Sequence, residues 1–265
     1  MSNPEQTPYA GHTAEGAGAP RMSTPETLAN IFFDPGATFE ALRARPRFLV
    51  AALLIVAFTV VVTTLLFQKV KFEDVVRQAI ENNPRTAQMS AEQKEQAIAM
   101  QSKPVFKYIA LSGPALGTVI VLAAGAGIYL LGAMLMGGRM TYKQALSVWS
   151  YSSFAPAVLG TILAVIMLFL KEPGDLDFNR PGAGLLVTNV GAFLGDKASP
   201  ILRAALSWLD LFTFYGMYLA AAGLRIVGKL SSGGAWAIVL VLWFIGILFS
   251  VSDVDIVGAP ASSAA

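Results

Sequence analysis

Residues 48–68 read FLVAALLIVAFTVVVTTLLFQ, a run without a charged side chain between Arg47 and Lys69. An α-helix rises about 1.5 Å per residue, so roughly 20 such residues cross the hydrocarbon layer of a bilayer. The run therefore predicts a transmembrane helix. The FQKVK that ends it lacks the small-residue pattern of a signal-peptidase site, so we expect the helix to be retained as an anchor.

Four further runs are also long and nearly free of charge. With the first run they give five predicted spans, at about residues 48–67, 108–136, 145–170, 207–227 and 233–252. The expected fold class is all-α, a polytopic membrane protein with a five-helix transmembrane bundle and a short amphipathic helix before the first span. The composition agrees, because 55% of the 265 residues are apolar and 14% are charged, against about 25% charged in soluble domains.

The same composition excludes several kinds of chemistry. There are 19 Lys and Arg against 17 Asp and Glu, so no strong field favours nucleic acid as a partner. The chain has no cysteine, and His12 is the only histidine, within a Gly/Ala/Pro-rich tail. Neither a P-loop nor an HExxH or GxSxG motif occurs. We therefore expect no enzyme, no catalytic residues, no cofactor and no metal site.

Short extramembrane segments precede the first span. Residues 1–23 are poor in large apolar groups and are predicted to form a disordered cytoplasmic tail. In residues 24–46, Thr24 and then Asp34 are suited to cap two short helices. Phe39 and Leu42 share a face of the second helix, which predicts an interfacial helix on the membrane surface. A charged juxtamembrane linker is the alternative.

The predicted membrane domain covers residues 47–252 and includes two long loops. Residues 69–107 predict two extramembrane helices, with Ser90 as an N-cap. In the loop 171–206 the stretch GLLVTNVGAFL is too short and too glycine-rich to cross a bilayer, so we expect it to pack against the outer surface of the bundle. Residues 253–265 are predicted to be a disordered tail.

Basic residues near the short connections predict the orientation. These residues are Arg43, Arg45 and Arg47 before the first span, Arg139 and Lys143 after the second, and Arg225 and Lys229 after the fourth. No Lys or Arg follows the fifth span. The N-terminus is therefore predicted in the cytoplasm and the C-terminus outside, with both long loops facing outward.

Small residues mark the second span as a packing surface. It contains the motif Gly113-x-x-x-Gly117 and further glycines with interleaved alanines. Glycines at this spacing let a second helix backbone come close, which predicts that this span is the central helix. A surface that lines a substrate pathway is the alternative.

Pro156 lies within the third span and removes a helix hydrogen bond to the carbonyl of Ser152. We expect a bend there, with Ser152 or Ser153 compensating the freed carbonyl. Broken membrane helices also form binding sites in transporters. Because no second, matching break occurs in the chain, the bend is interpreted as structural.

Asp210 is the only acidic residue inside a predicted span, and ionisable residues in such places are candidates for function. We interpret it as a structural acid near the outer face, held by a basic or hydroxyl partner such as Lys107, Lys171 or Tyr108. A proton or ion relay is the alternative, although a relay normally needs more than one such group.

Three stretches resemble the Yip (Ypt-interacting protein) family of membrane proteins, in the form common in bacteria. They are LANIFFDPGATFEALRARP at residues 28–46, MTYKQALSVWSYSSFAP at 140–156 and LDLFTFYGMYLAAAGL at 209–224. The resemblance implies a five-helix domain with a cytoplasmic N-terminus, placed in the bacterial cytoplasmic membrane, and implies no catalytic residues. Eukaryotic members are associated with Rab-type GTPases and vesicle traffic, but no GTPase-binding segment is evident here.

The leading interpretation of function is a non-enzymatic membrane protein that organises other membrane proteins or the bilayer itself. Its expected partners are the lipid bilayer and other membrane proteins, and a homo-oligomer stays open. A small transporter or channel subunit that uses Pro156 and Asp210 is the second interpretation, and a membrane enzyme is the third.

Overall fold

A computed structural model gives the structure of residues 22–81, 83, 86–172, 185–186, 188–194 and 198–258, without the side chains of 253–258. Its regular structure is helical. The helices are α1 Thr24–Asn30, α2 Pro35–Ala44, α3 Leu49–Lys69, α4 Phe72–Glu81, α5 Ala91–Gln101, α6 Pro104–Leu135, α7 Tyr142–Leu170, η3 Val190–Phe193, α8 Pro200–Ser207, α9 Leu211–Val227 and α10 Ser232–Gly258. The predicted tails lie outside these residues, except for residues 22–23 and for 253–258, where the backbone of α10 continues.

Four helices are long and apolar enough to cross a membrane, namely α3, α6, α7 and the Ser232–Ser252 part of α10. They cover the first, second, third and fifth predicted spans, although α6 begins earlier, at Pro104. The fourth predicted span, 207–227, is shorter in the structure. The chain leaves helical geometry after Ser207, and α9 begins at Leu211 with Asp210 as its N-cap. Its 17 residues measure about 26 Å along the axis.

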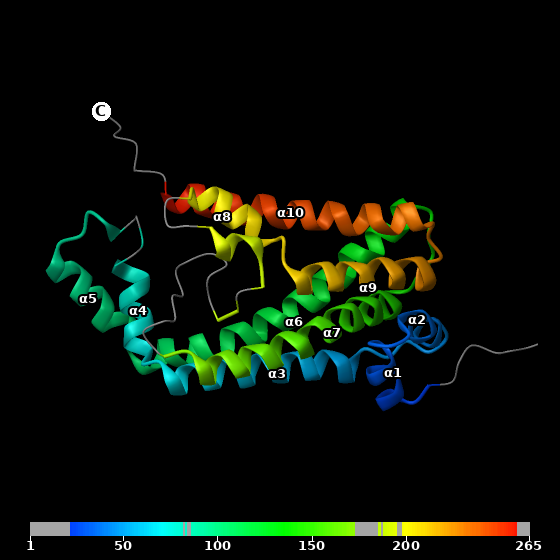
Figure 1. Cartoon of the computed structure of the whole chain (residues 1–265), viewed down its shortest axis with the longest axis horizontal. Helices are drawn as coiled ribbons and strands as arrows, with labels where there is room; N and C mark the ends of the chain where they lie inside the picture. The colour runs from blue at the N-terminus through cyan, green and yellow to red at the C-terminus, as the bar shows by residue number, and fades with distance from the viewer. Residues whose placement is uncertain are drawn as a thin grey trace, which may run out of the picture.

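The central helix is α7, so the prediction that the second span is central is wrong. Helix α7 packs against α3, α6, α9 and α2, and it runs through the middle of the bundle in Figure 1. Its buried face carries small polar residues, Ser147, Ser150 and Ser152, beside Val148 and Tyr151. Small side chains let several helices approach one backbone, which is why α7 and not α6 holds the core together.

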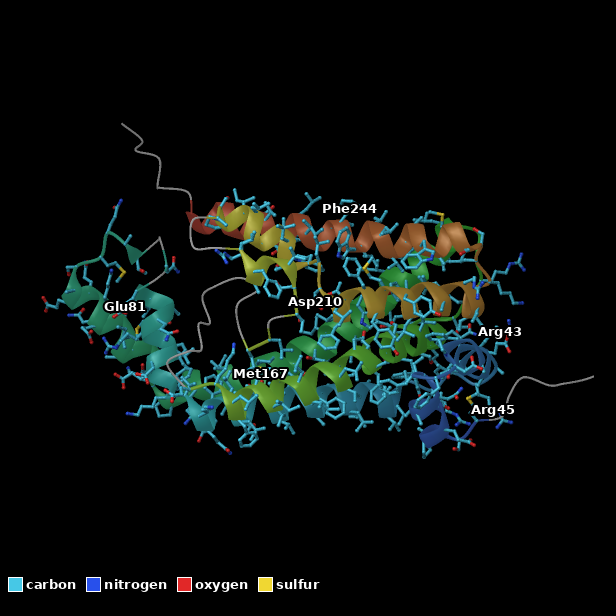
Figure 2. All side chains as sticks on the ribbon, viewed as in Figure 1. Arg43, Arg45, Glu81, Met167, Asp210 and Phe244 are labelled. Atoms are coloured by element: carbon cyan, nitrogen blue, oxygen red, sulfur yellow. The ribbon has the colours of Figure 1, made fainter. Side chains whose placement is uncertain are left out.

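The two ends of the bundle differ, and we name them by what they carry. The closed end consists of residues 22–48 with the short connections 136–141 and 228–231. The loop end consists of residues 70–103, the described part of 171–199, and α8. Figure 2 shows Arg43 and Arg45 at the closed end and Glu81 at the loop end.

The closed end begins with two capped helices. Ser23, not Thr24, caps α1 in a reciprocal capping box with Glu26. This box lowers the pKa of Glu26 below its ordinary value, first through the hydrogen bond from the Ser23 backbone. Asp34 caps α2 as predicted, by accepting from the amide of Ala37 at 2.9 Å.

The apolar face of α2 packs against the bundle instead of facing the membrane surface. Phe39 and Leu42 are fully buried, and Phe39 lies against Val148 of α7 and Gly223 of α9. Phe32 makes an edge contact with Phe154, whereas Phe33 is 85% exposed. The sequence pattern shows that α2 has an apolar face, but tertiary contacts decide what covers it.

The loop end carries structure of its own. Helices α4 and α5 pack on each other around Val76, Ile80 and Ile98, and they project from the bundle in Figure 1. Ser90 caps α5 as predicted. Helix α8 and η3 also belong to this end. The η3 turn, which is part of the stretch GLLVTNVGAFL, packs against α8, and α8 packs against α10.

Candidate functional site

Asp210 lies at the start of α9, outside the helical turns. One carboxylate oxygen accepts from the Thr213 amide at 2.9 Å and from the Thr213 hydroxyl at 3.4 Å. The other oxygen accepts from the Thr188 hydroxyl. A short antiparallel bridge joins Asn189 to Asp210, with Val190 and Leu211 donating backbone hydrogen bonds across it. The side chain thus joins α9 to the loop before η3.

The hydroxyl partners of Asp210 are Thr188 and Thr213, and they replace the partners named from sequence, Lys107, Lys171 and Tyr108. A carboxylate at an N-cap satisfies amide groups that the first turn of a helix leaves unpaired. It also interacts favourably with the positive end of the helix dipole. The geometry fits a structural acid.

Pro156 lines a groove between α6, α7, α9 and α10, which we call the Pro156 groove. Its volume is about 670 Å³, and its wall includes the aromatic side chains of Tyr129, Trp149, Trp208, Phe212 and Trp243. Trp243 donates from Nε1 to the backbone carbonyl of Trp208 at 3.1 Å, which fixes the Trp243 ring against the chain between α8 and α9. The lining also includes residues with hydroxyl groups, namely Tyr129, Ser152, Ser153 and Thr213.

The backbone around Pro156 stays helical, and α7 continues through it to Leu170. The hydroxyl of Ser152 donates to the carbonyl of Trp149 at 3.1 Å. The carbonyl of Ser152 faces Gly216 on α9, where an added Cβ would lie 3.5 Å from that oxygen and from Pro156 Cγ. The proline therefore opens a place at which α9 approaches α7 closely.

Gly113 and Gly117 lie on a part of α6 that the described bundle leaves uncovered. A Cβ added to either glycine would meet nothing within 4 Å. Two other glycines of α6 are the ones that pack. A Cβ on Gly125 would lie 2.3 Å from Trp149, and one on Gly132 would lie 2.9 Å from Ile238.

The four residues singled out from the sequence do not converge on one centre. Thr213, which donates to Asp210, also lines the groove that contains Pro156, but Gly113 and Gly117 lie elsewhere. Within the described residues, no group of three or more His, Asp or Glu side chains could hold a metal ion. The groove offers rings and hydroxyls, which suit contact with apolar chains more than acid–base chemistry.

Sequence reasoning missed Arg203, a buried arginine in α8. It is 5% exposed, and its Nη1 donates to the carbonyl of Leu194 at 2.9 Å and to that of Gly191 at 3.4 Å. It therefore fixes η3 on α8. The sequence does carry a signal for it, a single arginine within the apolar stretch PILRAALS. An arginine that is buried with such a helix needs partners for its charged group.

Comparison with known proteins gives one family and one curated relative. The Yip1 domain matches residues 29–252. The chain is 24% identical to membrane protein YknW of Bacillus subtilis (strain 168) over 225 residues, which is 85% of this chain and 88% of that protein. No solved structure matches significantly.

Proposed function

The chain belongs to the Yip1 domain family, and from this premise we propose that it is a non-enzymatic membrane protein that organises other membrane proteins through its lipid-facing helix surfaces. It is a multi-pass membrane protein, with four helices able to span and α9 between them. Its contribution in this proposal is a surface for lateral contact, without a reaction.

The observation that carries the proposal is the uncovered part of α6. Gly113 and Gly117 are open, and Leu116 and Ile120 beside them are exposed. Between membrane helices, small residues allow close backbone packing, because no hydrophobic driving force separates protein from lipid. The open pair thus supplies a contact surface for a transmembrane helix outside this chain.

We propose five crossings, with α9 as the fourth. Arg225 lies in its last turn and Asp210 at its start, so charged groups mark both ends. The length of α9 is within the lower range for a membrane helix. With the exposed basic residues of the closed end in the cytoplasm, the N-terminus is inside, the C-terminus is outside, and the host is a bacterial cytoplasmic membrane.

Reporter fusions test this topology. Reporters after Arg139 and Lys229 are expected to be active as cytoplasmic fusions, and reporters in residues 86–103 as external fusions. A reporter at the C-terminus that is active only in the cytoplasm would contradict five crossings.

Cross-linking in native membranes tests the contact surface. The chain has no cysteine, so a single introduced thiol is the only one to react. We expect Gly117→Cys to give an adduct with another membrane protein when a membrane-permeable thiol-to-amine cross-linker is added. The matched control is Leu248→Cys, an exposed apolar position on α10.

Equal adducts from Gly117→Cys and Leu248→Cys would contradict a specific surface, because random collision in the membrane labels both alike. Adducts that contain only two copies of this chain would show that the surface binds a second copy of the chain and not a different membrane protein. Mass spectrometry of the adduct distinguishes these outcomes.

The transporter interpretation needs Asp210 to act together with the Pro156 groove. Asp210 is instead occupied by Thr213 and Thr188 at the start of α9. Stable hydrogen bonding of this kind favours a structural role over a relay, in which the carboxylate must repeatedly bind and release a proton or an ion.

A further inference from the structure

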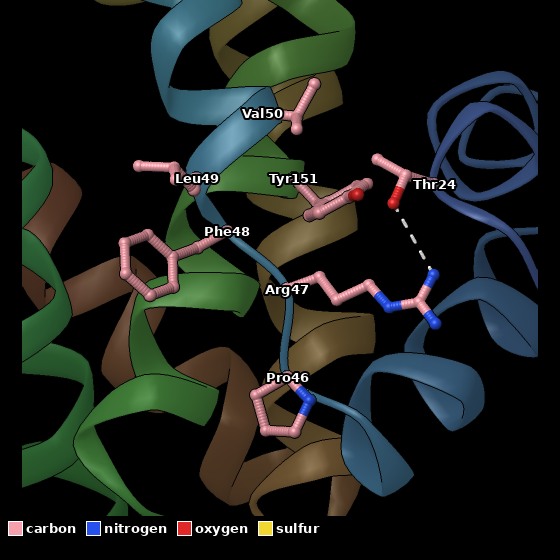
Figure 3. Close-up of a pocket in the computed structure, with 7 residues that line it drawn as sticks. All are labelled: Thr24, Pro46, Arg47, Phe48, Leu49, Val50 and Tyr151. Atoms are coloured by element: carbon pink, nitrogen blue, oxygen red, sulfur yellow. Dashed lines mark hydrogen bonds between the residues drawn. The ribbon is translucent and has the colours of Figure 1, made fainter.

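A smaller cavity lies at the closed end, where the chain passes from α2 into α3. Its volume is about 260 Å³, and it is lined by Thr24, Pro46, Arg47, Phe48, Leu49, Val50 and Tyr151. These residues come from α1, from the connection before α3, from the first turn of α3 and from α7, as Figure 3 shows. We call it the Arg47 pocket.

The guanidinium group of Arg47 keeps one donor edge unused. Its Nη1 donates to the carbonyl of Met22 at 3.0 Å and to the hydroxyl of Thr24 at 3.5 Å. Among the described residues, no acceptor binds Nε or Nη2, and no carboxylate lies within ion-pair distance of Arg47. Nε and Nη2 share the edge with which arginine binds two oxygens of one oxyanion.

The hydroxyl of Tyr151 is a second polar group directed into this pocket. Tyr151 is 1% exposed, and its oxygen points toward the side where Thr24 and the Arg47 guanidinium lie (Figure 3). Within the described residues no hydrogen bond engages this hydroxyl. A buried tyrosine hydroxyl normally has a partner, so this hydroxyl is available to donate to an oxyanion bound in the pocket.

The first turn of α3 adds backbone donors. Phe48 is its N-cap and provides no side-chain capping bond. The first amides of a helix have no partner within the helix, and the dipole makes this end positive. Leu49 and Val50 line the pocket, so this first turn of α3 forms part of its wall.

The charges around the pocket also favour an anion. Glu26, the acid of α1, is engaged with Ser23 at 2.7 Å, and Asp34 caps α2. The closed end and the helix turns that adjoin it also carry exposed basic side chains that form no ion pair with any described residue. They are Arg43, Arg45, Arg139, Lys143, Arg225 and Lys229.

We propose that the Arg47 pocket binds a phosphate group, presented by the headgroup of an anionic phospholipid. The pocket is smaller than the roughly 300 Å³ at which sites for whole drug-sized ligands begin, so it suits one headgroup. Leu49 and Val50 are 60% and 44% exposed, and they continue from the pocket along α3. Acyl chains attached to a bound phosphate find an apolar surface there.

The inference is tested by the thermal stability of the purified protein in a neutral detergent. Dioleoyl phosphatidylglycerol is titrated, and dioleoylglycerol, which has the same chains without the phosphate, is the lipid control. Inorganic phosphate, against chloride at equal ionic strength, tests for a free anion. We expect phosphatidylglycerol to raise the melting temperature saturably and dioleoylglycerol to leave it unchanged.

Two arginine variants separate a site from general attraction. Arg47→Gln is expected to weaken the lipid effect about tenfold or more, because it removes a charged donor pair. Arg45→Gln removes the same charge from an exposed neighbour that does not line the pocket, and it should retain the effect. An Arg47-dependent shift with inorganic phosphate alone would assign the site to a free anion.

Equal lipid effects in Arg47→Gln and in the unchanged protein would overturn the proposal, as would equal effects of the two lipids. Tyr151→Phe removes only the hydroxyl and keeps the buried ring, so it decides the matter if Arg47→Gln does not fold. A severalfold weaker lipid effect in Tyr151→Phe supports the pocket, and an unchanged effect contradicts it.

Discussion

The closed end and the loop end are built on different principles. At and beside the closed end, segments far apart in the sequence are hydrogen-bonded to one another: the Arg139 amide donates to the Gly228 carbonyl at 3.0 Å, and the Gln144 side chain donates to the Arg43 carbonyl at 3.0 Å. At the loop end, α4 and α5 form a separate small cluster around Ile80 and Ile98. A change at the closed end should therefore affect the whole bundle, whereas a change at the loop end should stay local.

Backbone geometry supports the same distinction. Lys229 has a positive φ of 55° in the connection between α9 and α10, and Gly137 has a φ of 77° after α6. Non-glycine residues rarely adopt such a conformation. Both described residues with a positive φ thus lie in the short connections of the closed end.

The largest expected effect is at Phe39. Phe39→Ala removes a fully buried ring from the junction of α2, α7 and α9, and should lower the free energy of unfolding by about 3–5 kcal/mol. The control is Phe33→Ala, at a side chain that is 85% exposed, with an expected effect within about 0.5 kcal/mol. Unfolding in detergent measures both, and equal losses would mean that α2 is not part of the bundle core.

A second test enlarges the same junction. Gly223→Ala would place a Cβ 2.7 Å from Val148 Cγ1 and 2.9 Å from Phe39 Cε1. We expect a loss of about 1–3 kcal/mol, as for other overpacked cores. Gly127→Ala is the matched control, because a Cβ on Gly127 meets nothing within 4 Å. Gly127→Ala should be neutral or slightly stabilising. An equal loss of unfolding free energy in both variants would mean that the Gly223 junction is not packed more tightly than the open side of α6.

The positions of the membrane helices were predictable because uncharged runs report directly on the lipid environment. Helix starts at Asp34 and Ser90 were predictable because capping is local chemistry. The shortened start of α9 was missed, since the apolar run hid the capping role of Asp210. The central role of α7 was missed as well, because Ser152 was interpreted only as a partner for the freed carbonyl, and the small size of the buried serines of α7 was not considered.

The candidate sites were less predictable than the helices. The motif Gly113-x-x-x-Gly117 identifies a helix face made of small residues, but only the arrangement of the other helices shows that this face is open. Arg47 counted in the sequence as one more positive charge near the membrane. Its proximity to Tyr151 depends on how α3 packs against α7, which no local pattern encodes.

Asp210, at the start of α9, tests how far a local change spreads. Asp210→Ala should cost about 1 kcal/mol, as loss of an N-cap usually does. Asp210→Asn keeps an acceptor for the Thr213 amide and should cost less. Melting and ion or proton flux in liposomes are measured on the same variants. Flux in the unchanged protein that Asp210→Asn abolishes, with an unchanged melting profile, would favour the relay interpretation.

The smallest effect is expected at the exposed ion pairs of α4 and α5. Arg77 donates to Glu95 at 2.5 Å and lies 3.5 Å from Glu73 and 3.9 Å from Glu81. The hydrogen bond from Arg77 lowers the pKa of Glu95 below its ordinary value of 4.5. A lowered acid pKa means that the contact stabilises the helix pair above that value and is lost as the pH falls through the lowered pKa.

Spin labels on α4 and α5 should therefore show a constant distance distribution from about pH 7 to pH 5 and a broader one below about pH 4.5. Glu95→Gln should be slightly broadened already at neutral pH and should respond less to acid. Glu92→Gln, at an exposed acid of the same helix that does not pair with Arg77, should behave like the unchanged protein. Because exposed pairs are screened by solvent, the effect should also shrink in high salt and leave the melting of the bundle unchanged. A bundle that melts earlier in Glu95→Gln would show that the loop end is coupled to the core after all.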